Sequence, residues 1–261
     1  MTASFEQRLA GRVVILAGGT GGIGAVVARQ LHAEGASLVL GYRRAHERAA
    51  AVAQELRAAG DAPVALVPGD LADAEVRVRL VAEAHALGAP YGLVVLAGDP
   101  ARPRQGEATQ EEMEAAWRDN YLGPVLLARA FAADAAAVAG AIVLLSTMQA
   151  HALFEGSLAY AAPKAALVHA ARLLAKEWGG VRDVRVNIVA PGVTAAGMAE
   201  ASIRSGKYDR FVQDGAIRRF GRAEDVARAI RFFLEPDGYV TGQVLVVDGG
   251  LTLRRDVRAA G

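Results

Sequence analysis

Short, wholly apolar runs recur along the chain, and longer stretches rich in Ala and Leu separate them. The short runs are rich in Val, Ile and Leu, which is typical of parallel strands buried on both faces. Strands are expected at 13–16, 37–40, 64–67, 92–96, 141–145, 185–189 and 244–247. Helices are expected at 25–34, 46–59, 74–87, from about 110, through Tyr160 towards Gly179, and at 224–234. This alternation predicts an α/β protein with a parallel sheet.

The composition fits one domain that spans 1–261. The 261 residues contain no composition break, and 53% of them are apolar, which is enough for a large core. A net charge of +1 provides no strong field towards nucleic acid or a membrane surface, so neither partner is expected. Cysteine is absent, which excludes disulfides and thiolate chemistry. The scattered His residues have no ligand spacing, and no metal site is expected.

Neither a signal peptide nor a membrane span is expected. Residues 1–11 include Glu6 and Arg8 and have no apolar centre. The most apolar region, 130–145, is interrupted by Asp134 and Gly140 and is too short to cross a bilayer. A cytoplasmic location is therefore expected.

A glycine-rich turn follows the first expected strand and opens the first helix. It contains Gly18, Thr20, Gly22, Ile23 and Gly24. Glycines in this strand–turn–helix context let the backbone approach a pyrophosphate, and the helix N-terminus supplies N–H donors. The alternative is a tight turn that is rich in glycine for steric reasons alone. The context favours dinucleotide binding.

The second expected strand ends in a basic sequence, Gly41-Tyr42-Arg43-Arg44, with no acid before Glu47. An acid at this place would bind the ribose 2′-hydroxyl of NAD, whereas Arg43 or Arg44 can hold a 2′-phosphate through charge-assisted hydrogen bonds. The alternative is a solvated basic turn. The sequence therefore favours NADP(H) over NAD(H).

Tyr160 and Lys164 are four residues apart at the start of a helix, which places both side chains on one face. An ammonium beside a phenol favours the phenolate, so the pKa of Tyr160 is expected to fall towards the working pH. Such a phenol exchanges a proton with a substrate oxygen. Taken alone, the spacing also describes an ordinary surface pair.

Further candidates follow the other strands, where open α/β sheets bind ligands. Asp70 is expected to accept a hydrogen bond from an adenine amino group, and Asp73 to cap the next helix. The remaining strand-end candidates are Leu71, Ala97, Gly98, Ser146, Thr147, Pro191, Gly192 and Thr194. Asn120 is expected near the middle of the helix from 110, either in a simple hydrogen bond or in chemistry. The irregular stretch 195–220 is expected to form a mobile substrate lid.

Together these motifs, in this order from Gly11 to Leu253, resemble the short-chain dehydrogenase/reductase family, and most closely the branch that includes 3-oxoacyl thioester reductases. The matching motifs are Gly18-x-x-x-Gly22-x-Gly24, Asp70, Ala97-Gly98, Asn120, Tyr160-x-x-x-Lys164, Pro191-Gly192 and the closing Tyr239-x-Thr241-Gly242-Gln243 to Asp248-Gly249-Gly250. The resemblance implies a single-domain, doubly wound Rossmann fold, with a seven-stranded parallel sheet and helices on both faces.

The resemblance also implies a mechanism. Tyr160 would give the proton as the nicotinamide hydride reaches a carbonyl carbon, and Lys164 would lower the pKa of Tyr160 and bind the nicotinamide ribose. Asn120 would hold a water molecule that links Lys164 to solvent. Thr147 stands where the family has its carbonyl-positioning serine, and Ser146 should point to the other side of the strand.

Three positions depart from the family pattern. Ala17 replaces a Thr and Leu96 replaces an Asn, two residues that in the family lie close together and tie two turns. Losing both partners of a buried hydrogen bond can be nearly neutral, so we interpret this as a paired replacement. Ala196 stands where a Thr often contacts the cofactor, and Thr194 is a candidate to compensate.

Three functions remain open at this stage. The first is an NADPH-dependent reductase of a ketone or a 3-oxoacyl group, and the second is an NADP(H)-binding sensor or scaffold without redox chemistry. The third is a dehydrogenase that works in the oxidative direction. The absence of Lys and Arg from 132–140 weakens the acyl-carrier interpretation, whereas Arg204, Lys207 and Arg210 could attract an anionic group. The resemblance further implies a homotetramer that pairs through the helices bearing Asn120 and Tyr160.

Overall fold

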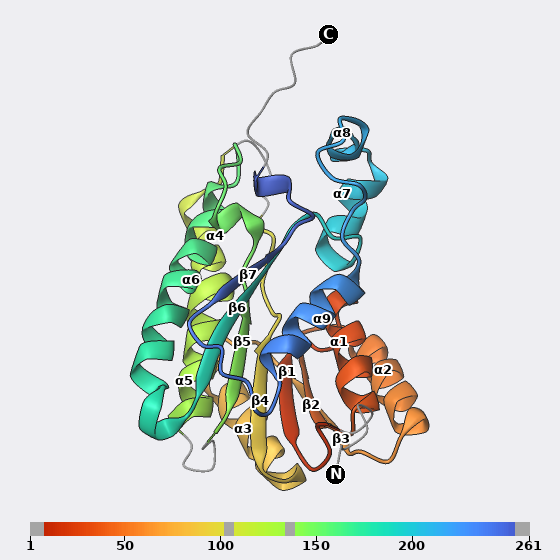
Figure 1. Ribbon diagram of the computed structural model, residues 1–261, viewed down its shortest axis with the longest axis vertical. Coiled ribbons are helices and arrows are strands. Elements are labelled where there is room, and N and C mark those ends of the chain that lie inside the picture. Colours follow the sequence, from red (N-terminus) through yellow and green to blue (C-terminus); the bar gives the residue numbers. More distant parts are fainter. Residues whose placement is uncertain (1–7, 102–106, 134–138, 254–261) are drawn as a thin grey trace.

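The computed structural model describes residues 8–101, 107–133 and 139–253, and it confirms the seven-stranded parallel sheet (Figure 1). The strand order is β3-β2-β1-β4-β5-β6-β7, and every neighbouring pair is parallel. The strands are β1 Val13–Ala17, β2 Ser37–Tyr42, β3 Val64–Pro68, β4 Pro90–Val95, β5 Ala141–Leu145, β6 Arg185–Pro191 and β7 Val244–Val247. The chain reverses direction across the sheet between β1 and β4, which is where doubly wound sheets bind ligands.

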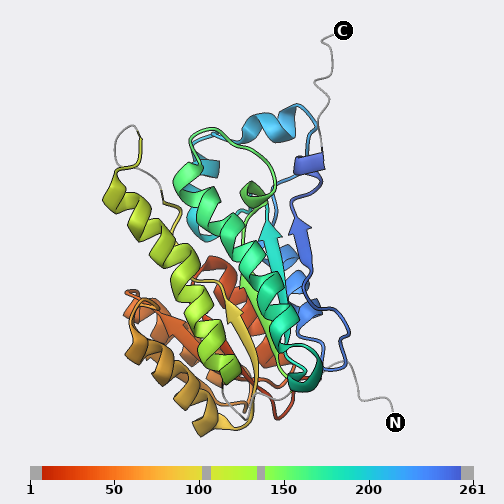
Figure 2. The same ribbon diagram turned by 90° about the vertical axis from the view of Figure 1, so that its left-hand side faces the viewer.

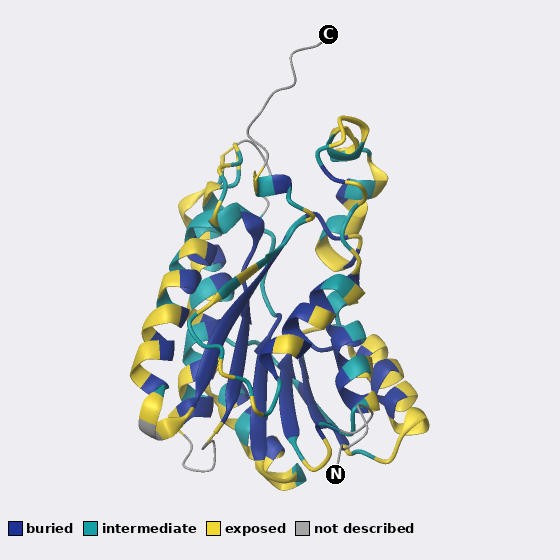
Figure 3. Cartoon of the chain, in the orientation of Figure 1, coloured by how far each residue is buried: buried dark blue, intermediate teal, exposed yellow. Residues whose placement is uncertain are grey.

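Helices cover both faces of the sheet, as expected (Figures 1 and 2). One layer contains α1 Gly22–Ala33, α2 His46–Ala59 and α9 Ala223–Phe233, and the other contains α3 Ala74–Leu87, α5 Gly123–Ala133 and α6 Leu158–Trp178. Alternate residues of β1 enter the two cores: Val14 and Leu16 face the α1 layer, whereas Val13 and Ile15 face the α3 layer. The central strands β1, β4, β5 and β6 are therefore buried on both sides, whereas the edge strands β3 and β7 are partly exposed, as Figure 3 shows.

The helix expected from 110 is interrupted. Helix α4, Gln110–Trp117, is capped by Thr109, whose side chain accepts a hydrogen bond from Glu112 N–H at 3.3 Å. A π-helical turn, Arg118–Leu122, then carries Asn120 before α5 begins at Gly123. Pro124 has no N–H to donate, which favours a change of hydrogen-bond pattern at this place. Asn120 therefore lies in a local widening of the helix and not within a regular one.

The stretch 195–220 is folded into short helices that stand apart at the top of Figure 1. These are a 3₁₀ turn at Gly197–Ala199, α7 Glu200–Arg204 and α8 Asp209–Gln213. Their apolar side chains Ile203, Tyr208 and Phe211 pack against a small third core, whose buried members are Met148, Val193, Ile217 and Leu251. This lid segment thus packs on residues that follow β5, β6 and β7, beyond the carboxyl ends of these strands.

Asp73 occupies the N-cap position of α3 as predicted, but its side chain makes no capping hydrogen bond. Part of the stretch 132–140 and the tail from Arg254 lie outside the described residues. Within the described ranges, no helix is long and apolar enough to cross a membrane.

Candidate active site

A cleft of about 970 Å³ opens at the carboxyl edge of the sheet, between the strand ends and the start of the lid segment. The register aligns the ends of β1, β2 and β4, since Ala17 pairs with both Gly41 and Val95. Most predicted site residues line this cleft: Gly18, Thr20, Gly22, Ile23, Gly24, Arg43, Arg44, Asp70, Leu71, Ala97, Gly98, Thr147, Tyr160, Pro191, Gly192 and Thr194. Asn120 and Lys164 are buried behind its wall, with 0% and 3% exposure.

The glycine-rich turn has the shape that a pyrophosphate needs. Gly18 has φ +89°, and a Cβ there would lie 2.8 Å from Ala97 N. A Cβ at Gly24 would overlap the carbonyl oxygen of Gly18. The N-terminus of α1 has neither a side-chain cap nor an acid in its first turn. Its free N–H groups and positive end therefore fit the pyrophosphate of a dinucleotide.

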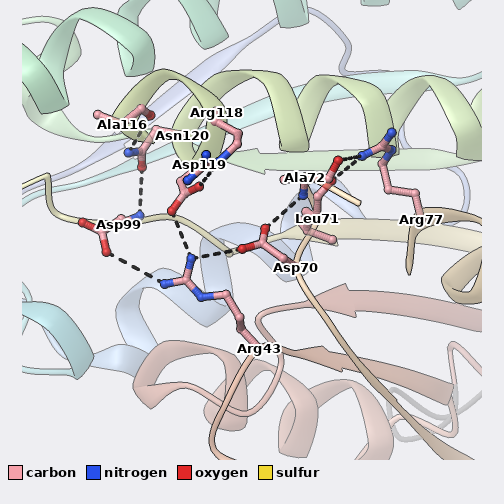
Figure 4. A network of polar contacts seen from close by, with 10 residues as sticks. All are labelled: Arg43, Asp70, Leu71, Ala72, Arg77, Asp99, Ala116, Arg118, Asp119 and Asn120. Carbon is pink, nitrogen blue, oxygen red and sulfur yellow. Dashed lines mark hydrogen bonds and ion pairs between the residues drawn. The ribbon is translucent and has the colours of Figure 1, made fainter. Parts of the chain in front are cut away.

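The other end of the cleft is basic. Arg43, Arg44 and Arg48 line it, but they differ in their partners. Arg43 contacts the carboxylates of Asp70, Asp99 and Asp119, as Figure 4 shows. Within the described part of the chain, Arg44 and Arg48 pair with no carboxylate. Two unpaired guanidinium groups therefore face the end of the cleft where the adenosine ribose is expected.

The carboxylate of Asp70 is less available to an adenine amino group than expected. Its Oδ1 accepts a hydrogen bond from Ala72 N–H at 2.9 Å, and its Oδ2 lies 3.4 Å from Nη1 of Arg43. Since both oxygens already have partners, the carboxylate would have to share a lone pair with an adenine amino group.

Asn120 is fixed by two hydrogen bonds within the buried wall. Its Oδ1 accepts from Asp99 N–H at 3.1 Å, and its Nδ2 donates to the carbonyl oxygen of Ala116 at 3.0 Å. The second bond joins the π-helical turn to α4, because Ala116 lies one turn earlier in that helix. The amide is therefore held in one orientation, with a remaining lone pair and a remaining N–H for other partners.

Lys164 lies close to Asn120 behind Gly98. Its Nζ donates a hydrogen bond to the carbonyl oxygen of Leu145 at 2.8 Å. Burial lowers the pKa of Lys164 to about 8, because the charged form loses its hydration. An amine with a pKa near neutrality can change its charge during a reaction more easily than a solvated lysine.

The pKa of Tyr160 does not fall as expected. Burial raises the pKa of the phenol, a hydrogen bond from Thr147 lowers it, and the charge of Asp99 raises it further. The predicted lowering of this pKa by Lys164 is wrong for this structure, because burial is the largest influence and only the hydrogen bond from Thr147 lowers the pKa. Together these effects raise the pKa of Tyr160 and keep the phenol protonated, which suits a proton donor.

The two hydroxyls after β5 point in different directions. Ser146 Oγ donates to the carbonyl oxygen of Lys164 at 3.1 Å and is 2% exposed. Thr147 hydrogen-bonds with Tyr160, and its Oγ1 also accepts from Gln149 N–H at 3.3 Å. Both residues line the cleft, but only the Thr147 hydroxyl lies beside the phenol, whereas the Ser146 hydroxyl is bound to the backbone of α6.

Backbone hydrogen bonds replace the side-chain tie at Ala17 and Leu96. The carbonyl oxygen of Ala17 accepts from Leu96 N–H at 2.8 Å and from Ala97 N–H at 3.0 Å. Both side chains are buried, and within the described ranges no buried side-chain N or O lacks a partner. The paired replacement thus leaves no buried polar side chain at these two positions without a hydrogen-bond partner. Near the departure at Ala196, Thr194 Oγ1 donates to Gly192 O at 3.2 Å.

Several residues of the cleft were not expected from the sequence. A Cβ at Gly22 would lie 2.5 Å from Gly197 N, so the lid segment begins directly against the first turn of α1. Asp99 and Asp119 contact Arg43, and Asp119 lines the cleft together with Arg48, which lies in α2 four residues after Arg44. The spacing of Arg44 and Arg48 is visible in the sequence, whereas the other contacts join distant segments and carry no local signal.

Comparisons with known proteins agree with this site. Residues 17–252 match the family model described as enoyl-(acyl carrier protein) reductase. Galactitol 2-dehydrogenase (L-tagatose-forming) of Cereibacter sphaeroides is 35% identical, over 94% of this chain and 97% of its own. The 3-oxoacyl-(acyl-carrier-protein) reductase FabG of Aggregatibacter actinomycetemcomitans is 32% identical, over 91% of this chain and 98% of its own.

Solved structures show the same likeness in three dimensions. A short-chain dehydrogenase from Burkholderia cenocepacia J2315 in complex with NADP superposes with a TM-score of 0.84 and 31% identity. The match covers 94% of this chain and 99% of that one. Fold, cleft and relatives therefore agree, and the chain belongs to the short-chain dehydrogenase/reductase family of oxidoreductases.

Proposed function

We propose that this protein reduces a ketone or a 3-oxoacyl group to the alcohol with NADPH. The observation that supports this most directly is the pairing of Tyr160 with Thr147 on the cleft wall, with Lys164 and Asn120 buried behind them. A protonated phenol beside a hydroxyl is suited to bind and protonate a carbonyl oxygen. The proposal of a non-redox NADP(H)-binding protein does not explain why a lysine with a lowered pKa lies behind that phenol.

The chain's own residues supply the acid chemistry. When bound, the cofactor would supply a hydride to the carbonyl carbon. Thr147 donates a hydrogen bond to the carbonyl oxygen and orients it, and Tyr160 transfers its proton to that oxygen, so that the ketone gains one hydride and one proton. Lys164 and Asn120 then support return of a proton to Tyr160 from solvent. The raised pKa of Tyr160 keeps the phenol protonated near neutral pH, which is the form that a reductase needs.

The preference for the 2′-phosphate is assigned to Arg44 and Arg48. Both line the cleft and are free of carboxylate partners within the described residues, so their charge is available to an anion. Arg43 is less suited, because its guanidinium already contacts three carboxylates. The relative from Burkholderia cenocepacia, which is described in complex with NADP, supports this choice.

The substrate is proposed to meet the apolar side of the lid segment. Phe154, Ile203, Tyr208 and Phe211 belong to the small core formed there. Lys207 and Arg210 are stacked over the rings of Tyr208 and Phe211, at 5.6 Å and 5.2 Å from the ring centroids. These features suit an apolar ketone, or an acyl thioester whose carrier group is anionic.

The test follows the loss of NADPH absorbance with an acetoacetyl thioester, a cyclic ketone and an aromatic ketone, with NADH in parallel. We expect turnover of at least one substrate with NADPH and little turnover with NADH. Tyr160→Phe should keep NADPH binding, measured by nucleotide fluorescence, and lose turnover by about 10²-fold or more. Substantial turnover by Tyr160→Phe would refute the assigned proton donor, and tight NADPH binding without any turnover would favour the non-redox function.

We also propose the homotetramer implied by the family resemblance. Trp117 at the end of α4, Leu122 in the π-helical turn and Leu158 and Leu173 on α6 are 42%, 47%, 71% and 48% exposed. Large apolar side chains on adjacent helices support pairing through this layer. Light scattering after size-exclusion chromatography tests this, and a monomeric mass would contradict it.

A further inference from the structure

Arg43 lies at the centre of a group of carboxylates beside the catalytic wall of the cleft (Figure 4). Its Nη1 lies 3.0 Å from Asp119 Oδ2 and 3.4 Å from Asp70 Oδ2, and its Nη2 lies 4.0 Å from Asp99 Oδ2. The planar guanidinium carries several donors in a fixed geometry, so it can hold carboxylates that come from three different segments. Arg43 follows β2, whereas its partners follow β3, follow β4 and lie in the π-helical turn.

Two of these carboxylates belong to residues that determine the position of Asn120. Asp119 directly precedes Asn120 in the π-helical turn. Asp99 donates its backbone N–H to Asn120 Oδ1 at 3.1 Å. Arg43 therefore binds both the turn that carries Asn120 and the loop that fixes its amide oxygen.

The contact with Asp119 is the shortest and the most protected of the three. The side chain of Asp119 is 11% exposed, and its Oδ1 lies 3.4 Å from Nε of Arg118 in the same turn. Without Arg43, Asp119 would keep only this longer contact, and three carboxylates would face one another without a shared cation. Since like charges at this separation repel each other, the turn and the loop at Asp99 would move apart.

The same carboxylates argue against Arg43 as a phosphate ligand. A 2′-phosphate beside Arg43 would meet Asp70, Asp99 and Asp119, which oppose its charge. Arg44 and Arg48 line the same end of the cleft without such neighbours in the described chain. The chain thus divides two tasks between adjacent arginines.

We propose that Arg43 is a positioning residue for Asn120, which it aligns with Lys164 through Asp119 and Asp99. This rests on the function proposed above, in which Asn120 supports proton return through Lys164. The 2′-phosphate is bound by Arg44 and Arg48, and Arg43 acts on the turnover step.

The first experiment needs neither cofactor nor activity. The protein contains two tryptophans, and Trp117 directly precedes the π-helical turn, with its ring packed edge-on against Tyr121 at 5.5 Å. Trp178 lies at the far end of α6. In ¹⁹F NMR of the 5-fluorotryptophan-labelled protein, Arg43→Gln and Asp119→Asn should each shift or broaden the Trp117 signal and leave the Trp178 signal unchanged.

A matched control removes an ion pair of the same kind away from the cleft. Arg228 pairs with Asp225 on α9, and its side chain is 65% exposed. Arg228→Gln should leave both tryptophan signals in place. Arg43→Lys, which retains the charge, should move the Trp117 signal less than Arg43→Gln does.

The second experiment separates positioning from binding. Arg43→Gln should lower kcat about tenfold and change the Kd for NADPH and NADH by less than about threefold. Adding Asp119→Asn to Arg43→Gln removes the unpaired carboxylate, so the double variant should recover part of kcat instead of losing more. Arg44→Gln should behave in the opposite way to Arg43→Gln. It should weaken NADPH binding and leave the Trp117 signal unmoved.

Two results would overturn the proposal. One is an Arg43→Gln protein whose Trp117 signal and kcat both match the parent. The other is a selective loss of NADPH affinity in Arg43→Gln with an unmoved Trp117 signal, which would make Arg43 a phosphate ligand. If the parent protein reduces no ketone at all, the proposed function fails, and the NMR experiment still decides whether Arg43 holds the turn.

Discussion

Gly98 leaves the space that Asn120 occupies: a Cβ at Gly98 would lie 2.8 Å from Asn120 Oδ1 and 3.3 Å from Lys164 Nζ. The glycine is required here for close approach and not for a special backbone angle, since its φ is not positive. It separates the open cleft from the two buried polar groups behind the wall. The Ala97-Gly98 motif therefore has a steric explanation in this structure.

Gly98→Ala should reduce turnover by about tenfold or more, because Asn120 and Lys164 must move to admit the methyl group. We expect a loss of about 1–3 kcal/mol in the free energy of unfolding, measured by urea denaturation, as for other overpacked sites. In an Asn120→Ala background the clash with Oδ1 is absent, so Gly98→Ala should add little. Full additivity of the two substitutions would contradict the steric explanation.

Thr147 can be tested with two substitutions of different chemistry. Thr147→Val keeps the shape but removes the hydroxyl, and kcat should fall by about 10²–10³-fold, as when an oxyanion donor is lost. Thr147→Ser keeps the hydroxyl and should remain within about fivefold of the parent. Because the hydroxyl lowers the pKa of Tyr160, the alkaline limb of the pH–rate profile should move to higher pH in Thr147→Val. An unchanged kcat in this variant would transfer the role to another group.

The buried Lys164 should make stability depend on pH. Burial lowers its pKa to about 8 in the folded protein, from an ordinary value of 10.5. Between these values the unfolded chain binds more protons than the folded one, so the free energy of unfolding should rise with pH over this range. The contribution is at most about 3 kcal/mol, and it should be missing in Lys164→Met.

The measurement for Lys164 is a series of urea denaturations from pH 7 to 10.5, and the slope against pH is compared between the two proteins. The absolute stabilities are less informative, because Lys164→Met also leaves the carbonyl oxygen of Leu145 without its donor. Equal slopes in parent and variant would show that Lys164 has an ordinary pKa.

Arg44 and Arg48 should decide cofactor preference. Arg44→Gln should weaken NADPH binding about tenfold, the value of one charge-assisted contact, and leave NADH binding nearly unchanged. Adding Arg48→Gln should weaken NADPH binding further, until the two nucleotides bind alike. Isothermal titration with both nucleotides provides the measurement, and an equal loss of NADH affinity would indicate a general effect on the cleft.

Local sequence determined the architecture of this protein. The apolar runs and the helical stretches each carry their own periodicity, so the seven strands and most helices were predicted within a few residues. The glycine turn, Tyr160 and the strand-end residues such as Thr147 also reached the cleft as expected, because parallel strands bring their carboxyl ends to one edge. Motif order along the chain was sufficient for this part of the site.

Tertiary structure alone decided the electrostatics. The raised pKa of Tyr160 and the lowered pKa of Lys164 follow from burial, which spacing along a helix does not report. The contact between Arg43 and Asp119 joins residues 76 positions apart, and Gly22 and Gly197, which approach each other closely, are still further apart in sequence. Such contacts depend on how strand ends and turns are placed relative to each other, and no local pattern of hydrophobic and polar residues records that placement.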